Sequence, residues 1–186
     1  STTGVDLSWN ASAGATRYKI FRGIGVASDD ITPVDPAITG TTFTDTTAAS
    51  GTVYTYAVKA VGGVGASDSD LSNTDTGYVG LSAPAGFSAS DGDSAAGVNP
   101  AWTATEGAIR YKIFRGIGVA DNDITPASPD ITGTTFADTT AVAGTVYTYA
   151  VKAVGESGVD DSPASNSDTG SRGSSAVPTP TRFLAS

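Results

Sequence analysis

The sequence predicts an all-β protein built from two copies of one unit, and three observations support this prediction. First, the twelve residues from Gly51 to Gly62 return unchanged from Gly144 to Gly155, a spacing of 93 residues. Second, the eleven residues from Arg17 to Ala27 return at the same spacing, beginning at Arg110. Third, the repeated segments alternate apolar and polar side chains, which is the period-two pattern of half-buried strands. Two such units account for all 186 residues.

The first part of the unit predicts two strands joined by a loop. The stretch that ends at Trp9 alternates, which places Val5, Leu7 and Trp9 on one buried face. A loop of small residues follows. The next alternating stretch places Tyr18 and Ile20 toward the core, and the glycine after it closes the strand.

The second part of the unit predicts a long connection and three further strands. Residues 24–40 contain several Asp and Pro residues, so at most one short edge strand is expected there. Residues 41–45 are β-branched and brief, with Phe43 facing inward. Residues 51–62 carry tyrosines and valine at alternate positions, which predicts the central strand. Residues 71–78 supply the last strand of the copy.

Composition and charge argue against several classes of function. Lys and Arg number 10 against 19 Asp and Glu, and the net charge of −9 repels nucleic acid and anionic membranes. No apolar run is long enough for membrane insertion. Cys and His are absent, which removes disulfides, thiolate metal sites and the usual general base, so neither a cofactor nor catalysis is expected. The low charged fraction of 16% favours an extracellular or cell-surface protein.

Three further patterns each have a structural and a functional interpretation. Short acidic clusters recur in the loops, and solvated charge is favoured over a bound Ca²⁺ ion, which needs six to eight converging oxygens. Asn10 begins a glycosylation sequon, and residues 171–181 form either an O-glycosylated stretch or a semi-rigid linker. The alternating aromatic residues could stack on sugars, but the core needs the same side chains, and a core role is favoured.

The order of the motifs in both copies resembles that of the fibronectin type III domain. The motifs are a Pro-x-x-Phe-x-Ala-Ser segment, a tryptophan strand, Tyr-Lys-Ile-Phe-Arg, the repeated Gly-Thr-Val-Tyr block and a closing Ser-x-x-Ser at Ser69. The resemblance implies two tandem seven-stranded β-sandwiches, with the strand-B tryptophans at Trp9 and Trp102. It also implies a tyrosine corner at Tyr54 and Tyr147, whose hydroxyls would bond upstream backbone.

Members of the family that it resembles serve as spacers, adhesion modules and ligand-binding modules. The chain contains no Arg-Gly-Asp sequence, so integrin-type adhesion is not implied. Pro100 stands where the first copy has Leu7, and a proline in an inner strand removes a donor from the ladder. A bulge or a local loss of pairing is therefore expected at Pro100.

The first copy begins almost at its tryptophan strand and lacks the strand A that precedes the second one. The segment from Pro84 to Ser90 has no counterpart before Trp9, but the tail from Val177 to Ser186 matches it. The predicted domains are residues 1–79 for repeat 1 without strand A, residues 80–172 for repeat 2, and residues 173–186 for a linker and the strand A of a following repeat or subunit.

An open apolar strand edge is a feature that proteins cover, so a donated strand is expected on the first copy. The predicted acceptor edge is Val5, Leu7 and Trp9, and the predicted assembly strand contains Val177, Phe183, Leu184 and Ala185. The expected partners are copies of the chain itself, head to tail, with glycans or a cell surface as further candidates.

These features favour a structural component of an extracellular filament or adhesin in a prokaryote, whose repeats are joined by strand complementation or by a continuous chain. The prokaryotic source is implied by the resemblance. The alternative is a non-catalytic spacer or a carbohydrate-binding module in a secreted multidomain enzyme. Further 93-residue units in the neighbouring sequence would favour the fibre, and a catalytic domain there would favour the alternative.

Overall fold

The computed structural model of the protein describes residues 3–31, 37–92, 94–126 and 129–174. The described part is all-β, and it contains no helix that is long and apolar enough to cross a membrane. The chain divides into two compact units, of which the first comprises Ser1–Ser82, Thr105–Ile109 and Ala153–Pro163. The second comprises Ala83–Ala104, Arg110–Lys152 and Ala164–Ser186.

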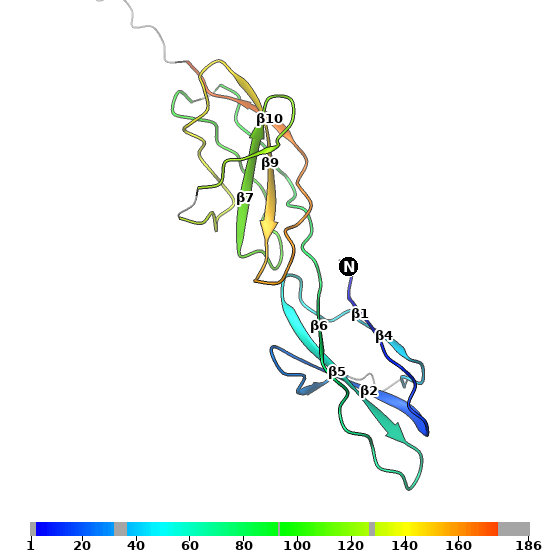
Figure 1. Ribbon diagram of the computed structural model, residues 1–186. Helices are drawn as coiled ribbons and strands as arrows, with labels where there is room; N and C mark the ends of the chain where they lie inside the picture. Colours follow the sequence, from blue (N-terminus) through cyan, green and yellow to red (C-terminus); the bar gives the residue numbers. More distant parts are fainter. Residues whose placement is uncertain (1–2, 32–36, 93, 127–128, 175–186) are drawn as a thin grey trace, which may run out of the picture. The chain divides into compact units, whose positions relative to one another are not determined.

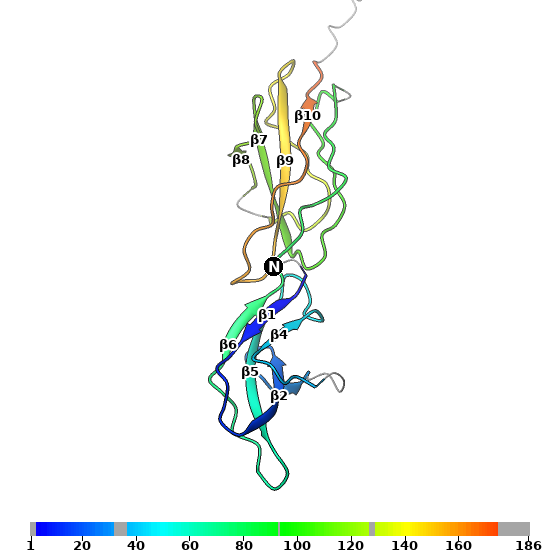
Figure 2. The same cartoon turned by 90° about the vertical axis from the view of Figure 1, so that its right-hand side faces the viewer.

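The first sandwich is formed by strands β1 to β6 (Figure 1). Their bounds are β1 Val5–Ser8, β2 Ala15–Gly23, β3 Asp29–Asp30, β4 Thr42–Asp45, β5 Val53–Gly62 and β6 Asp75–Tyr78. Strands β1 and β4 form a two-stranded antiparallel sheet, and the other four form a sheet in the order β3-β2-β5-β6. In both views of the ribbon, β2 and β5 lie side by side in the centre of the larger sheet (Figures 1 and 2).

The second sandwich repeats this plan with strands β7 to β10. Their bounds are β7 Arg110–Gly116, β8 Asn122–Asp123, β9 Val146–Val154 and β10 Asp168–Ser171. These four strands form a sheet in the order β10-β9-β7-β8. The counterpart of the β1 and β4 sheet is reduced to bridges, in which Val98 pairs with Asp138 and Ala101 pairs with Thr135.

The core of the first sandwich lies between its two sheets, and alternation in the strands supplies it. Val5 of β1 packs with Tyr18 and Ile20 of β2 and with Tyr56 of β5, and Ile20 is fully buried. The sequence-based prediction that Tyr18 and Ile20 face inward is confirmed. Phe43 of β4 is partly buried and packs against the same cluster, as predicted.

Pro100 removes hydrogen bonding from its strand without shifting the register. Its carbonyl accepts a hydrogen bond from the N–H of Phe136 at 3.0 Å, and the same pairing joins Leu7 to Phe43 in the first sandwich. The ring nitrogen of Pro100 has no N–H to return the second bond. The expectation of a bulge or a local loss of pairing at Pro100 is therefore met by the loss of pairing, with no shift of register.

A buried carboxylate organises one end of each sandwich. Asp45 is 1% exposed, and one of its oxygens accepts hydrogen bonds both from Arg22 Nη1 at 2.6 Å and from the Tyr56 hydroxyl at 2.9 Å. The N–H and hydroxyl of Thr47 donate to its other oxygen at 2.9 and 2.7 Å. The guanidinium of Arg22 also lies over the ring of Tyr54 at 4.7 Å.

The second sandwich repeats this cluster around Asp138, with Arg115 at 2.6 Å and Tyr149 at 2.9 Å. The tyrosines whose hydroxyls donate to a residue earlier in the chain are therefore Tyr56 and Tyr149, and each acceptor is a carboxylate rather than the backbone. The prediction of this role for Tyr54 and Tyr147 is wrong. Those two rings are half-buried, and an arginine covers each of them.

The two clusters predict a loss of stability in acid. Burial opposes the charged form of Asp45 and Asp138, but the hydrogen bonds from threonine, arginine and tyrosine outweigh it and lower the pKa of both carboxyls. A carboxyl whose pKa is lower in the folded than in the unfolded protein stabilises the folded state at pH values above its unfolded pKa of about 3.9. That contribution is lost as the pH falls through the folded pKa.

We therefore expect the urea midpoint to fall as the pH is lowered below about 4. The variants Asp45→Asn and Asp138→Asn should be less stable at pH 7 and should lose less on acidification than the wild type. An equal pH dependence in wild type and variants would contradict the assignment of this sensitivity to the two carboxylates.

Candidate functional site: an open groove in the first sandwich

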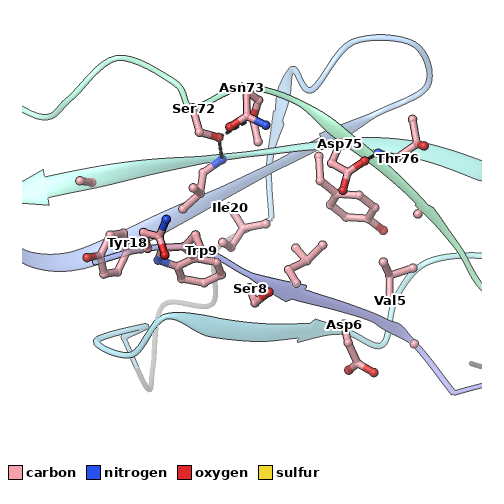
Figure 3. Close-up of a pocket in the computed structure, with 18 of the residues that line it drawn as sticks. Val5, Asp6, Ser8, Trp9, Tyr18, Ile20, Ser72, Asn73, Asp75 and Thr76 are labelled. Carbon is pink, nitrogen blue, oxygen red and sulfur yellow. Dashed lines mark hydrogen bonds between the residues drawn. The ribbon is translucent and has the colours of Figure 1, made fainter. Parts of the chain in front are cut away.

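The first sandwich contains a cavity of about 1080 Å³ along the free side of β1. Val5 and Trp9 line one side of it, and Asn73, Asp75 and Thr76 line the opposite side (Figure 3). Its floor consists of core side chains from β2 and β5, including Tyr18, Ile20, Tyr56 and Val58. We call this cavity the groove.

The second sandwich has a chain segment at the equivalent position, residues 87–91, which we call the A segment. The backbones of Ser88 and Ala101 exchange two hydrogen bonds, at 2.9 and 2.8 Å. The ring of Phe87 stacks on Trp102, with centroids 6.5 Å apart and planes inclined by 24°. Asp91 forms a parallel bridge to Ser171 of β10, so the A segment joins the two sheets at their edges.

Two polar side chains also hold the A segment, those of Asn166, just before β10, and of Asp168, the first residue of β10. The side-chain amide of Asn166 donates to the Phe87 carbonyl at 3.1 Å. The carboxylate of Asp168 accepts the N–H of Ala89 at 3.0 Å. Both contacts are made to the backbone of the A segment, so they select an extended strand rather than a particular side chain.

The same receptor residues recur in the first sandwich without an A segment. Ala101 pairs with Thr135 on one side and with Ser88 on the other, whereas its counterpart Ser8 pairs with Thr42 alone among the described residues. Trp102 is buried at 6% exposure, and its counterpart Trp9 is half-buried.

Two further equivalent pairs show the same difference. Val151 is fully buried, while Val58 is half-buried in the groove floor. A Cβ atom on Gly170 would meet Ala89 of the A segment at 2.9 Å, but one on Gly77 would meet Val5 and no such segment. The groove therefore has the shape and the receptor groups of a strand position that no described residue occupies.

The predicted site residues are placed as follows. Val5, Leu7 and Trp9, the predicted acceptor edge, all line the groove, and the exposed Asn10 lies at its rim. The predicted assembly residues lie outside the described residues; they are Val177, Phe183, Leu184 and Ala185. Whether the edge accepts a strand and whether Asn10 carries a glycan both stay predictions. The described residues contain no group of three acidic side chains suited to a metal ion.

The sequence did not predict a role for Asn73 and Asp75, the counterparts of Asn166 and Asp168, although the repeat contains a signal for them. The tetrapeptide Ser-Asn-Thr-Asp at 72–75 returns as Ser-Asn-Ser-Asp at 165–168. Repeated polar residues ahead of a strand are also typical of a turn, so the pattern alone did not separate the two roles. In the second sandwich, Asn166 and Asp168 show the role directly.

The matched pair Asp168→Ala and Asp75→Ala tests this assignment. We expect Asp168→Ala to destabilise the second sandwich by about 1 kcal/mol, because it leaves the N–H of Ala89 without its acceptor. Asp75→Ala should change the stability of the first sandwich by less than about 0.5 kcal/mol in dilute protein, since Asp75 is exposed there. NMR-monitored urea titration resolves the two sandwiches, and equal losses would contradict the assignment.

Comparison with known proteins relates the chain to two enzymes by sequence, while no protein-family model matches it. A stretch of 167 residues is 29% identical to Chitinase A1 of Niallia circulans, covering 82% of this chain and 22% of the chitinase. A stretch of 68 residues is 43% identical to an amylopullulanase of Thermoanaerobacterium saccharolyticum, covering 37% of this chain and 5% of that protein. The chain thus spans less than a quarter of either relative.

Comparison with solved structures relates the fold to fibronectin type III domains. A two-domain fibronectin type III segment of chicken tenascin matches 91% of this chain and 93% of its own length, with a TM-score of 0.66 and 20% sequence identity. The chain is therefore an all-β protein with the fibronectin type III fold in two tandem copies, as the resemblance in its motifs implied.

Proposed function

We propose that the chain is a non-catalytic spacer in an extracellular, multidomain protein that acts on polysaccharides. The observation that carries this proposal is the extent of the similarity to Chitinase A1, which takes in 82% of this chain but 22% of the chitinase. The second relative is also named as an enzyme of polysaccharide breakdown, and the match covers an even smaller part of it. A chain that resembles part of such proteins, and that lacks His and Cys, fits an accessory module.

A spacer is favoured over a carbohydrate-binding module by the placement of the aromatic rings. Stacking on a sugar requires an exposed ring face. Every Trp, Tyr and Phe in the described ranges is buried or half-buried, and Tyr149 is fully buried. Tyr18, Tyr56 and Trp9 pack in the core cluster of the first sandwich, which supports the core role favoured from the sequence.

The coding sequence on either side of these 186 residues tests the spacer function. A glycoside hydrolase domain in the same reading frame is the expected finding. The purified chain should also stay in the supernatant when insoluble chitin or starch granules are pelleted. Saturable binding to either polysaccharide would contradict a pure spacer and would identify a binding module.

A second function, a component of an extracellular fibre built from near-identical repeats, is favoured by the groove. A strand position of the first sandwich that no described residue occupies, together with a segment that matches the A segment, supports a head-to-tail contact between repeats. Flanking sequence made of further 93-residue units without a catalytic domain would support the fibre and overturn the enzyme spacer.

A further inference from the structure

We propose that residues 177–186 of a second copy of this chain fill the groove as its missing A segment. The groove is a strand position lined by both apolar and polar side chains, and the second sandwich shows how such a position is filled. This inference goes beyond the spacer function, and it holds whether or not an enzyme domain is attached.

The tail carries the sequence pattern of the A segment. In the second sandwich a buried proline, Pro84, precedes Phe87 by three residues, and Ala89 and Ser90 follow. In the tail Pro180 precedes Phe183 by three residues, and the next residues are Leu, Ala and Ser. No other segment of the 186 residues repeats this order of Pro, Phe, Ala and Ser.

Alignment of the two segments places the aromatic anchor over the half-buried Trp9. Phe183 takes the position of Phe87, whose ring stacks on Trp102 at 6.5 Å. Its partner in the groove is Trp9, which is half-buried and lies at the groove wall (Figure 3). Burial of a Phe ring against an indole supplies the largest apolar contact of the proposed interface.

The same alignment assigns the polar contacts. Leu184 replaces Ser88, so its N–H and carbonyl bond the backbone of Ser8, and its side chain points outward as the exposed Ser88 does. The N–H of Ala185 donates to Asp75, and the side-chain amide of Asn73 donates to the Phe183 carbonyl, as Asp168 and Asn166 do in the second sandwich.

A tail supplied by a second copy, unlike the chain's own tail, makes the filling of the groove depend on protein concentration.

A tail that enters the groove of the next copy makes a heterologous contact, since the donor and acceptor surfaces differ. Such a contact repeats without closing and produces a linear polymer. The proposal therefore predicts concentration-dependent growth of the purified 186-residue chain.

Sedimentation velocity on the full chain and on two variants tests the proposal. Wild-type protein should grow from the 18.4 kDa monomer into larger species as its concentration rises. Phe183→Asp, which removes the donor anchor, should stay monomeric, while the conservative Phe183→Leu should retain part of the association. The acceptor variant Asn73→Ala with Asp75→Ala changes exposed side chains and should associate at least tenfold more weakly.

Mixing the donor variant with the acceptor variant distinguishes strand donation from other association. The Phe183→Asp chain has an intact groove and the acceptor variant has an intact tail, so the mixture should form particles of about twice the monomer mass and nothing larger. Polymerisation of Phe183→Asp at the wild-type level would overturn the proposal.

A peptide with the sequence of residues 178–186 provides a second readout that does not depend on polymerisation. Added to the Phe183→Asp chain, it should bind in a 1:1 ratio and shift the fluorescence of Trp9 to shorter wavelength. The same peptide with Asp in place of Phe should not bind. The proposal would be overturned if the wild-type chain stays monomeric and does not bind the peptide. It would also be overturned if the tail of the same chain already covers Trp9 in the monomer.

Discussion

Asp138→Ala is expected to lower the free energy of unfolding of the second sandwich by about 3 kcal/mol. Asp138 is 1% exposed and accepts hydrogen bonds from Arg115, Tyr149 and Thr140. Its removal leaves the Arg115 guanidinium and a buried hydroxyl without their acceptor. The Arg115 side chain is 17% exposed and keeps some contact with water, which sets the loss at the low end for a broken buried ion pair.

The control for this variant is Asp130→Ala. Asp130 forms an ion pair with Arg110 at 3.5 Å, and both side chains are about half exposed. Exposed pairs contribute little, so the control should lose less than about 0.5 kcal/mol. Urea titration of both variants at pH 7 provides the measurement. Similar losses in the two variants would mean that the buried cluster does not hold the sandwich together.

The tryptophan pair gives the second large effect. Trp102→Ala should destabilise the second sandwich by about 4 kcal/mol, because the indole is buried between Phe87 and Tyr111. Trp9→Ala should cost the first sandwich about 2 kcal/mol, since Trp9 retains its contact with Tyr18 but has no ring stacked on its other face among the described residues. In dilute protein, equal losses would contradict an open groove at Trp9.

The strand positions were predictable because local pattern decides them. Tyr18 and Ile20 alternate with polar residues, and the structure buries both. The long connection after β2 was likewise predictable, because Pro and Asp residues cannot continue an inner strand. In it β3 takes two residues, Asp29 and Asp30, which is the short edge strand expected.

The buried polar cluster could not be predicted from the same pattern. Asp45 ends a strand and precedes two threonines, which is also the composition of a solvated turn. Its burial depends on Arg22 and Tyr56, which come from two other strands of the sandwich. A repeat spacing of 93 preserves all three residues but does not show that they meet. Tyr54 was favoured for the corner because alternation alone does not distinguish it from Tyr56.

The absence of a segment equivalent to residues 87–91 before Trp9 was predictable from the sequence, but the role of Asn73 and Asp75 as receptors was not. Comparison of the two copies shows that the segment before Trp102 has no counterpart before Trp9. The roles of Asn73 and Asp75 emerge from the second sandwich, where the equivalent side chains bond the backbone of the A segment. A side chain that bonds the backbone of the A segment does not require a particular residue there. The sequence of one copy therefore could not show that Asn73 and Asp75 have this role.

Amide hydrogen exchange at Ser8 and Ala101 is the measurement that tests the open groove most directly. The N–H of Ala101 bonds the Ser88 carbonyl and should be protected at every protein concentration. The N–H of Ser8 should exchange quickly in dilute protein and become protected as the concentration rises and tails enter the grooves. Protection of Ser8 equal to that of Ala101 in dilute protein would show that the strand position is already filled, and fast exchange at all concentrations would show that nothing fills it.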